Sequence, residues 1–237
     1  MSERGESRLE QWISVQTELT KLYVHDLKNP ISALASNLSF LDTADEEIAE
    51  IAGDCKTAVG TLLQMVEQLH LIAKLEKAEA EKSVGVEIST LIEAAVDKIG
   101  KLTVEGPPLR VVGDLPKAVC RCELKYARLA LEALIFTSVQ NCPAEGSVDV
   151  DAAVENERVR ISVRDDGRVV EPRYKESLFS RERQAAVKSA TGARYGKALG
   201  LYAVGLAVDH QGWSVEAGEH EGRASFTIWI PPDVSFR

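Results

Sequence analysis

The sequence predicts an α+β chain in which an N-terminal antiparallel helical hairpin is followed by an α/β sandwich. Apolar residues recur every three to four positions over two long stretches in the first third of the chain, as one buried helix face requires. Alternating apolar and polar residues at 147–154 and 159–163 predict paired strands further on. A Lys-, Glu- and Ala-rich stretch at 74–82 lies between, so we expect two domains, 1–82 and 83–237.

The first helix is expected to run from about Ser7 to Leu41. Its apolar residues fall in one sector of a helical projection: Trp12, Ile13, Tyr23, Leu27, Ile31, Leu34, Leu38 and Leu41. A capping signature at 43–46 precedes a second helix, whose apolar stripe extends from Ile48 to Ile72. Two helices alone bury only part of these stripes. We therefore predict that two hairpins pair into a four-helix bundle and that the protein is a homodimer.

Residues 83–237 are expected to form one sheet layer covered by helices. The pattern predicts helices at 88–99 and 123–139, and strands at 109–112, 147–154, 159–163, 213–217 and 225–230.

Composition narrows the classes of partner. The net charge of −9 argues against general binding to nucleic acid or to an anionic membrane, because both surfaces repel an acidic protein. No stretch approaches the roughly 20 apolar residues of a membrane span, and the first residues lack a secretion signal, so we expect a cytoplasmic protein. The spacing of the 4 cysteines fits neither a disulfide framework nor a zinc site, which predicts reduced thiols.

The stretch His25-Asp26-Leu27-Lys28-Asn29-Pro30 places an imidazole, a carboxylate and an amide within about one helical turn. His25 lies opposite the apolar sector among mostly small or polar residues, which leaves room for another protein to approach the ring. A solvated histidine is the simpler interpretation. The neighbours favour chemistry, since Asp26 can orient the ring or accept its proton and Asn29 can hold a water or a phosphoryl oxygen.

This hexapeptide resembles the H-box of sensor histidine kinases, whose pattern is His, an acid, two variable residues, Asn or Thr, then Pro. The resemblance implies that His25 is the phospho-acceptor and that Asp26 is its acid–base partner. It also implies that Asn29 acts when such proteins dephosphorylate a response regulator. For residues 83–237 it implies a sandwich of the histidine-kinase ATPase type.

The sandwich resembles that ATPase domain in its framework but departs from it at ligand positions. The two Asn positions of the family's N-box hold Ala133 and Thr137 here, and Thr137 offers one short hydroxyl as a metal ligand. Asp165 and Gly167 match the Asp-x-Gly-x-Gly motif, which fails at Val169. The resemblance implies that Asp165 binds an adenine amino group; an Asp-Gly turn after a strand is the alternative.

The stretch Gly196-Lys197-Ala198-Leu199-Gly200-Leu201 resembles the last glycine-rich motif of the family, with Ala198 in place of the middle Gly. Glycines ahead of a helix free backbone N–H groups for phosphate, so Gly196 and Gly200 are candidates for that role. His210-Gln211-Gly212 matches the family's helix end, which supports the fold and not catalysis. Residues 174–194 occupy the place of the flexible lid, or are a solvated loop.

A complete H-box beside a degenerate ATP site resembles the dimeric histidine phosphotransferases and pseudo-histidine kinases. We expect no metal site and no bound cofactor, with Mg-ATP binding weak at most. The leading prediction is that His25 carries a phosphoryl group to or from the aspartate of a response-regulator receiver domain. One alternative is a divergent ATP-dependent histidine kinase using Asp165, Gly167, Gly196 and Gly200. The other is a non-catalytic scaffold that binds a receiver or a kinase.

Overall fold

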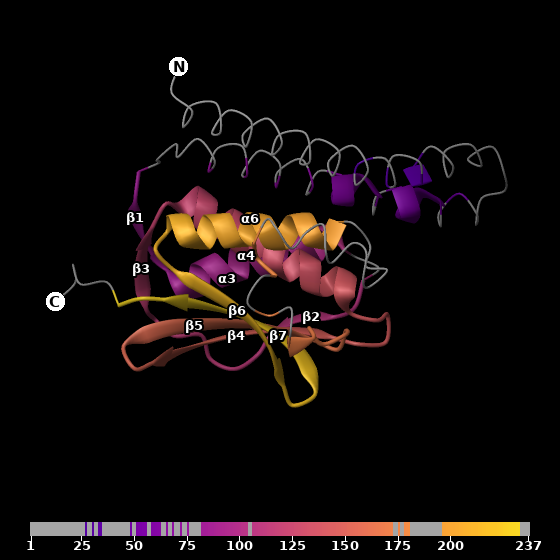
Figure 1. Cartoon of the computed structure of the whole chain (residues 1–237). Helices are drawn as coiled ribbons and strands as arrows, with labels where there is room; N and C mark the ends of the chain where they lie inside the picture. Colours follow the sequence, from indigo (N-terminus) through magenta and orange to yellow (C-terminus); the bar gives the residue numbers. More distant parts are fainter. Residues whose placement is uncertain are drawn as a thin grey trace, which may run out of the picture. The chain divides into compact units, whose positions relative to one another are not determined.

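The computed structural model describes residues 27, 30, 33, 34, 48, 51–55, 58–62, 65, 68, 72, 75, 82–103, 106–172, 175, 178–180 and 196–232. The chain divides into two compact units, residues 1–62 and 63–237. Every described residue of the first unit is helical, in agreement with the predicted helical region (Figure 1). His25, Asp26 and Asn29 lie outside the described residues, and the predicted domain boundary near residue 83 stays a prediction.

The second unit is built on a five-stranded sheet with the order β2-β4-β5-β7-β6. Its strands are β2 (Leu109–Val111), β4 (Val148–Glu155), β5 (Arg158–Asp165), β6 (Ser214–His220) and β7 (Arg223–Ile230). β2 pairs with β4 in parallel, and the other neighbours are antiparallel. The strands predicted from alternation are confirmed to within a few residues at their ends.

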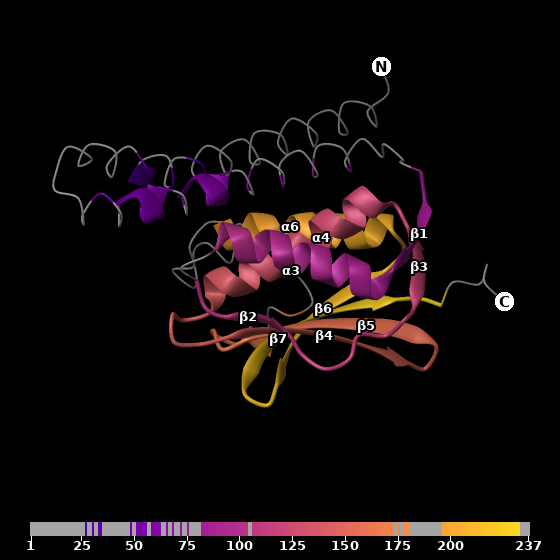
Figure 2. The ribbon, with the colours of Figure 1, turned by 180° about the vertical axis from the view of Figure 1, so that it is seen from behind.

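A separate antiparallel ribbon joins β1 (Val84–Glu87) to β3 (Val119–Cys122). It stands at one end of the sandwich in both views along the sheet (Figures 1 and 2). The sequence analysis predicted neither strand. Each has 4 residues, which is too short for an alternating pattern to stand out.

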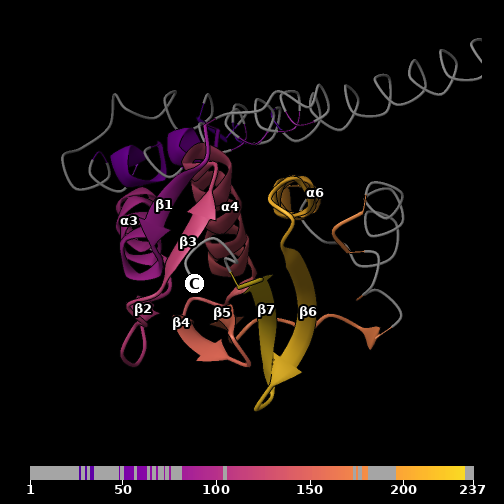
Figure 3. The ribbon, with the colours of Figure 1, turned by 90° about the vertical axis from the view of Figure 1, so that its left-hand side faces the viewer.

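Three helices of the second unit cover one face of the sheet, as the end view shows (Figure 3). They are α3 (Ile88–Leu102), α4 (Leu124–Asn141) and α6 (Gly196–His210). α3 is amphipathic and buries Ile88, Leu91, Ile92, Ala95 and Ile99. α4 packs against α3, α6 and the sheet, so it is buried on nearly every side. Its sequence therefore shows no clear division into an apolar and a polar face. No helix in the described part of the chain is both long and apolar enough to cross a bilayer.

Both ends of α4 are fixed by identifiable contacts. At its start, the Gln211 side chain makes two hydrogen bonds with the backbone of Glu123, at 3.0 and 3.1 Å, and His210 Nε2 lies 3.0 Å from Glu123 Oε1. The predicted helix-end motif therefore holds the end of α6 against the start of α4. At its end, Cys142 is extended because it precedes Pro143, so α4 stops at Asn141.

The face of the sheet that the helices leave open carries charged residues. β5 turns Val159, Ile161 and Val163 toward the helices, and Arg160 and Arg164 toward the opposite face. There Arg160 and Arg164 both pair with Asp151 on β4, at 2.8 and 2.6 Å. Cross-strand pairs of this kind fix the register of β4 against β5.

Glu132 is a buried acid between α3 and α4. Its side chain is 1% exposed, and its carboxylate pairs with Lys98 of α3 at 2.6 Å and with Arg128 at 2.8 Å. The two cations are more exposed, at 28% and 47%, so their charges reach water while the carboxylate does not. The two cations therefore stabilise the charge of the Glu132 carboxylate in place of water.

Replacing Glu132 by Ala is expected to lower the free energy of unfolding by about 2–4 kcal/mol, because a buried ion pair and its packing are lost. Asp97→Ala is the matched control. It removes the exposed α3 pair with Lys101, whose side chains are 63% and 75% exposed, and should change stability by at most about 0.5 kcal/mol. Urea denaturation followed by circular dichroism measures both. Equal midpoints for the two variants would contradict the assigned role of Glu132.

Candidate functional site

The last two turns of α4 carry the residues around which the predicted site assembles. Thr137 and Asn141 lie about one helical turn apart in this segment. Thr137 lies against Gly200 of α6, whereas Asn141 lies against the loop that follows β5. The predicted site therefore has two ends, one at Asn141 and the other at Thr137.

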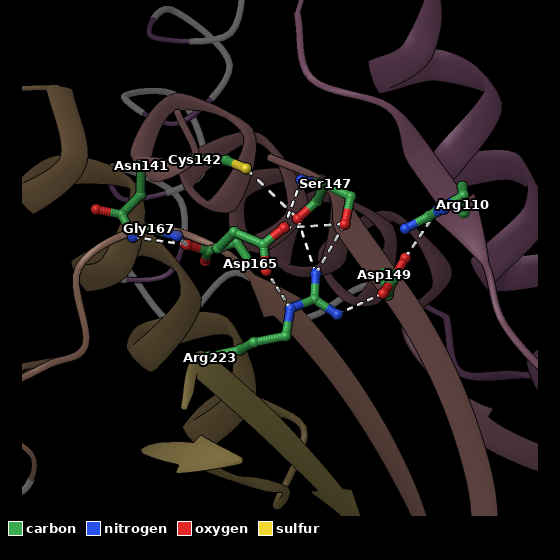
Figure 4. Close-up of polar contacts among 9 residues, drawn as sticks. Arg110, Asn141, Cys142, Ser147, Asp149, Asp165, Gly167 and Arg223 are labelled. Atoms are coloured by element: carbon green, nitrogen blue, oxygen red, sulfur yellow. Dashed lines mark hydrogen bonds and ion pairs between the residues drawn. The ribbon is translucent and has the colours of Figure 1, made fainter. Parts of the chain in front are cut away.

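At the first end, Asp165 closes β5 with a fully buried side chain. Its Oδ1 atom accepts hydrogen bonds from Asn141 Nδ2 at 2.7 Å and from the Gly167 backbone N–H at 2.9 Å (Figure 4). The structure thus brings Asp165 and Gly167 together, as the motif implied. The amide of Asn141 thus donates to one of the two oxygens of the carboxylate that the resemblance assigns to adenine.

Gly167 is required by close packing. A Cβ built there would lie 2.2 Å from Asn141 Nδ2 and 2.4 Å from the Asn141 backbone oxygen, both far inside contact distance. The backbone of Gly167 does not have a positive φ, so it is the close packing that requires glycine here. Gly167 is therefore a structural requirement of the junction between α4 and β5, whatever binds there.

At the second end, Thr137 is buried and its hydroxyl donates to the Ala133 carbonyl oxygen at 2.8 Å. A Cβ at Gly200 would lie 2.8 Å from Thr137 Oγ1 and 3.2 Å from Gln68 Nε2. Gln68 belongs to the second unit, is 3% exposed, and its Oε1 has no hydrogen-bond partner among the described residues. The hydroxyl of Thr137, which stands at the position of the family's second Asn, is thus bound to the backbone and lies close to Gly200.

The last glycine-rich motif is helical and does not precede the helix. The described part of α6 runs from Gly196, so Gly196 and Gly200 both lie within the helix, about one turn apart. The phosphate-binding role of Gly196 and Gly200 stays a prediction.

A second cluster, missed by the sequence analysis, fixes the loop that carries Asp166 and Gly167. Arg223 at the start of β7 donates to the Ser147 backbone oxygen at 2.9 Å, pairs with Asp149, and lies 2.5 Å from Asp166 Oδ1 (Figure 4). The Ser147 N–H and hydroxyl donate to Asp166 Oδ2 at 2.7 and 3.0 Å. Arg110 pairs with Asp149 from the other side at 3.0 Å. The only sequence signal was the charge on alternate strand positions.

Charge in this cluster shifts two ionisation equilibria. Partial burial opposes ionisation of Asp166, but hydrogen bonds from Ser147 and the Arg223 guanidinium outweigh it and hold the pKa of Asp166 below its usual range. Burial likewise opposes the charge of Arg223, and its bonds to Asp149 raise the pKa of Arg223 in spite of it. Both groups are held in their charged forms.

The residues fit Mg-ATP in part. Asp165 keeps the carboxylate expected at the base end. The metal end fits less well, because Thr137 replaces an amide ligand and its hydroxyl is bound to the backbone. In the part of the chain that the structure describes, no group of three or more His, Cys, Asp or Glu side chains is arranged to hold a metal ion.

Two family models match the chain. Residues 15–78 match the His Kinase A (phospho-acceptor) domain, HisKA. Residues 124–234 match HATPase_c, the histidine kinase-, DNA gyrase B- and HSP90-like ATPase. Sensor histidine kinase CpxA of Escherichia coli K12 is 26% identical, over 94% of this chain and 48% of CpxA. The chain spans about half the length of the curated relatives it matches.

Solved structures share the fold at low sequence identity. The histidine kinase AdeS of Acinetobacter baumannii has a TM-score of 0.59 and 17% identity, covering 88% of this chain and 98% of the other. Full-length ShkA in complex with AMPPNP has a TM-score of 0.55 and 22% identity, covering 91% of this chain and 45% of the other. These likenesses confirm the predicted fold class, a helical region plus an α/β sandwich.

Gly167→Ala should lower the free energy of unfolding by at least about 2 kcal/mol, because the added methyl meets the Asn141 backbone, which cannot give way as a side chain can. Gly218→Ala in β6 is the control, since nothing lies within 4 Å of a Cβ there. It should change stability by no more than about 0.5 kcal/mol. Thermal and urea unfolding measure both variants. A Gly167→Ala protein as stable as the control would refute the packing argument.

Asp166→Asn should destabilise the protein at neutral pH, and the difference from wild type should shrink on acidification. The folded-state pKa of Asp166 is depressed, so its carboxylate contributes stability above its unfolded pKa of about 3.9 and loses it as the pH falls through the folded value. Urea midpoints of both proteins, measured from about pH 7 down to about pH 3, test this, because the unfolded pKa of about 3.9 lies inside that range. A difference independent of pH would contradict it.

Proposed function

We propose that this chain, whose HisKA and HATPase_c domains match the transmitter core of a histidine kinase, acts in two-component signalling by carrying a phosphoryl group on His25. The observation that carries the proposal is the complete H-box, His25 to Pro30, inside the segment that matches the phospho-acceptor domain. The described residues of the sandwich bear on the source of the phosphoryl group and not on its acceptor.

The chemistry at His25 follows from the residue types. The neutral ring attacks phosphorus with its unprotonated nitrogen, an N–P bond forms, and the bond from phosphorus to the donor oxygen breaks. Asp26 accepts the proton from the other ring nitrogen, which keeps the product uncharged on the ring. Attack by a receiver aspartate then reverses these steps. Asn29 would direct a water at the aspartyl phosphate when the phosphoryl group is removed.

ATP is the first candidate donor, so the chain is proposed to be a divergent ATP-dependent histidine kinase. Support comes from the sensor histidine kinases to which it is similar and from the retained Asp165 at the base end of the site. ATP, when bound, supplies the phosphoryl group; Asp165 and Gly196 are the residues that would hold it. Because Thr137 offers one short hydroxyl in place of an amide ligand, the loss of such a contact should slow the reaction by about 10²–10³-fold.

A phosphorylated receiver domain is the second candidate donor, which would make the chain a histidine phosphotransferase. Two contacts support this function: Asn141 donates to one oxygen of the Asp165 carboxylate, and the Thr137 hydroxyl is bound to the backbone. A phosphotransferase needs the sandwich only as a shape and tolerates both. In either function we propose a homodimer through the helical hairpin, with the receiver docking at the face that carries His25.

Incubation with labelled Mg-ATP distinguishes the two donors. An active kinase gives slow labelling that is stable to base and labile to acid, is absent in His25→Ala, and persists in His220→Ala, which removes an exposed histidine at the end of β6. If both variants are folded and wild type takes no label, the ATP-dependent function is wrong. If His220→Ala also loses the label, His25 is not identified as the acceptor.

A second incubation tests the receiver as donor. Receiver domains phosphorylated by acetyl phosphate are mixed with the ATP-free protein, and a phosphotransferase moves phosphate to His25 and on to an unphosphorylated receiver. His25→Ala should abolish the transfer. If that variant still relays phosphate, His25 is not the carrier, and if wild type takes no phosphate from either donor, a non-catalytic scaffold remains.

A further inference from the structure

The β1–β3 ribbon holds two thiols that the proposed function does not use. Cys120 and Cys122 both lie on β3, where residues two apart point to the same side of a strand. Both side chains point inward: Cys120 is 3% exposed and Cys122 is 1% exposed. Arg121 between them and Val119 before them are exposed. Neither is in a disulfide; both are free cysteines.

The two thiols interact directly with each other. The Cys120 thiol is hydrogen-bonded to Cys122, and this bond lowers the pKa of the Cys122 thiol although burial and the Glu123 carboxylate oppose ionisation. Two buried thiols on one face of a four-residue strand, joined by a hydrogen bond, form a dithiol. Simple core packing needs neither the pairing nor the hydrogen bond.

We propose that Cys120 and Cys122 form a reversible redox modification site, which hydrogen peroxide converts to an intramolecular disulfide. In the first step the Cys122 sulfur attacks a peroxide oxygen, the O–O bond breaks, and water leaves after proton transfer, giving a sulfenic acid. The Cys120 sulfur then attacks the sulfenic sulfur, the S–O bond breaks, and a second water leaves. Two electrons pass from the dithiol to one peroxide.

Burial favours the disulfide over a metal complex as the product. A disulfide is neutral and apolar, whereas two thiolates on a soft monovalent ion keep a net negative charge, which is costly in a buried place beside Glu123. Hydrogen peroxide is also small and uncharged. It needs only a brief opening of a ribbon of two 4-residue strands to reach the sulfurs.

The disulfide would change the ribbon. Residues two apart on a strand have Cα atoms about 6.6–6.8 Å apart, at the upper limit of disulfide geometry, so β3 must contract around Arg121. The pairs Val84 with Cys122 and Val86 with Cys120 then lose their alignment. Oxidation should therefore speed amide hydrogen exchange at 84–87, and a small dithiol should reverse it.

The test uses the full chain as Cys55→Ser/Cys142→Ser, which retains only the pair. After hydrogen peroxide and alkylation in denaturant, we expect two thiols lost together, a monomer on a non-reducing gel and a mass lower by two hydrogens. Trypsin cuts after Arg121, so the disulfide should join peptides 118–121 and 122–125, which dithiothreitol separates. Wild type should give the same linked peptides, which guards against misfolding of the variant.

Cys122→Ser in this background is the control and should give no linked peptide. Three results would overturn the proposal: both thiols still alkylate fully after a dose that oxidises a small-molecule thiol, oxygen accumulates on one sulfur while the other stays reduced, or the linked peptides come from two chains. Unchanged exchange at 84–87 in a protein shown to carry the disulfide would refute the predicted effect on the ribbon.

Discussion

The contact between the end of α4 and the loop after β5 governs the sandwich and its site. Asn141 donates to the buried carboxylate of Asp165, and its backbone oxygen leaves no room for a side chain at Gly167. α4 packs against α3, α6 and the sheet, so its position fixes theirs. The hydrogen bonds from Asn141 and from the Gly167 backbone N–H both end on Asp165 Oδ1, so one carboxylate oxygen holds this junction together.

The residues that match family motifs divide into structural and chemical groups. Gly167, Gly200 and Gln211 each have a packing or hydrogen-bonding reason that is complete without a ligand. The roles of Asp165 and Gly196 toward adenine and phosphate stay predictions. Glycines that match an ATP-site motif can therefore be kept for the sake of the fold alone.

Ion pairs hold the parts of the sandwich that apolar packing leaves unspecified. Arg223 joins β7 to β4 and to the loop bearing Asp166, and Glu132 joins α3 to α4. Each pairing links elements far apart in sequence, and each includes a carboxylate that is largely shielded from water. Such pairs contribute mainly to register, since an isolated charge in the wrong register would be buried without a partner.

The sequence by itself determined the fold class, most of the elements and the H-box, because hydrophobic periodicity and a contiguous motif are local properties. It placed α3, α4, β4, β5 and β7 within a few residues, and it missed the short strands β1 and β3. Only the tertiary structure decided what Gly167 and Thr137 do and brought Arg223 to Asp166. The reason is physical: a glycine or a threonine has the same local signature beside a ligand as beside Asn141 or Gly200. Which neighbours a residue has depends on chain segments far apart in sequence, such as Arg223 and Ser147, which are 76 residues apart.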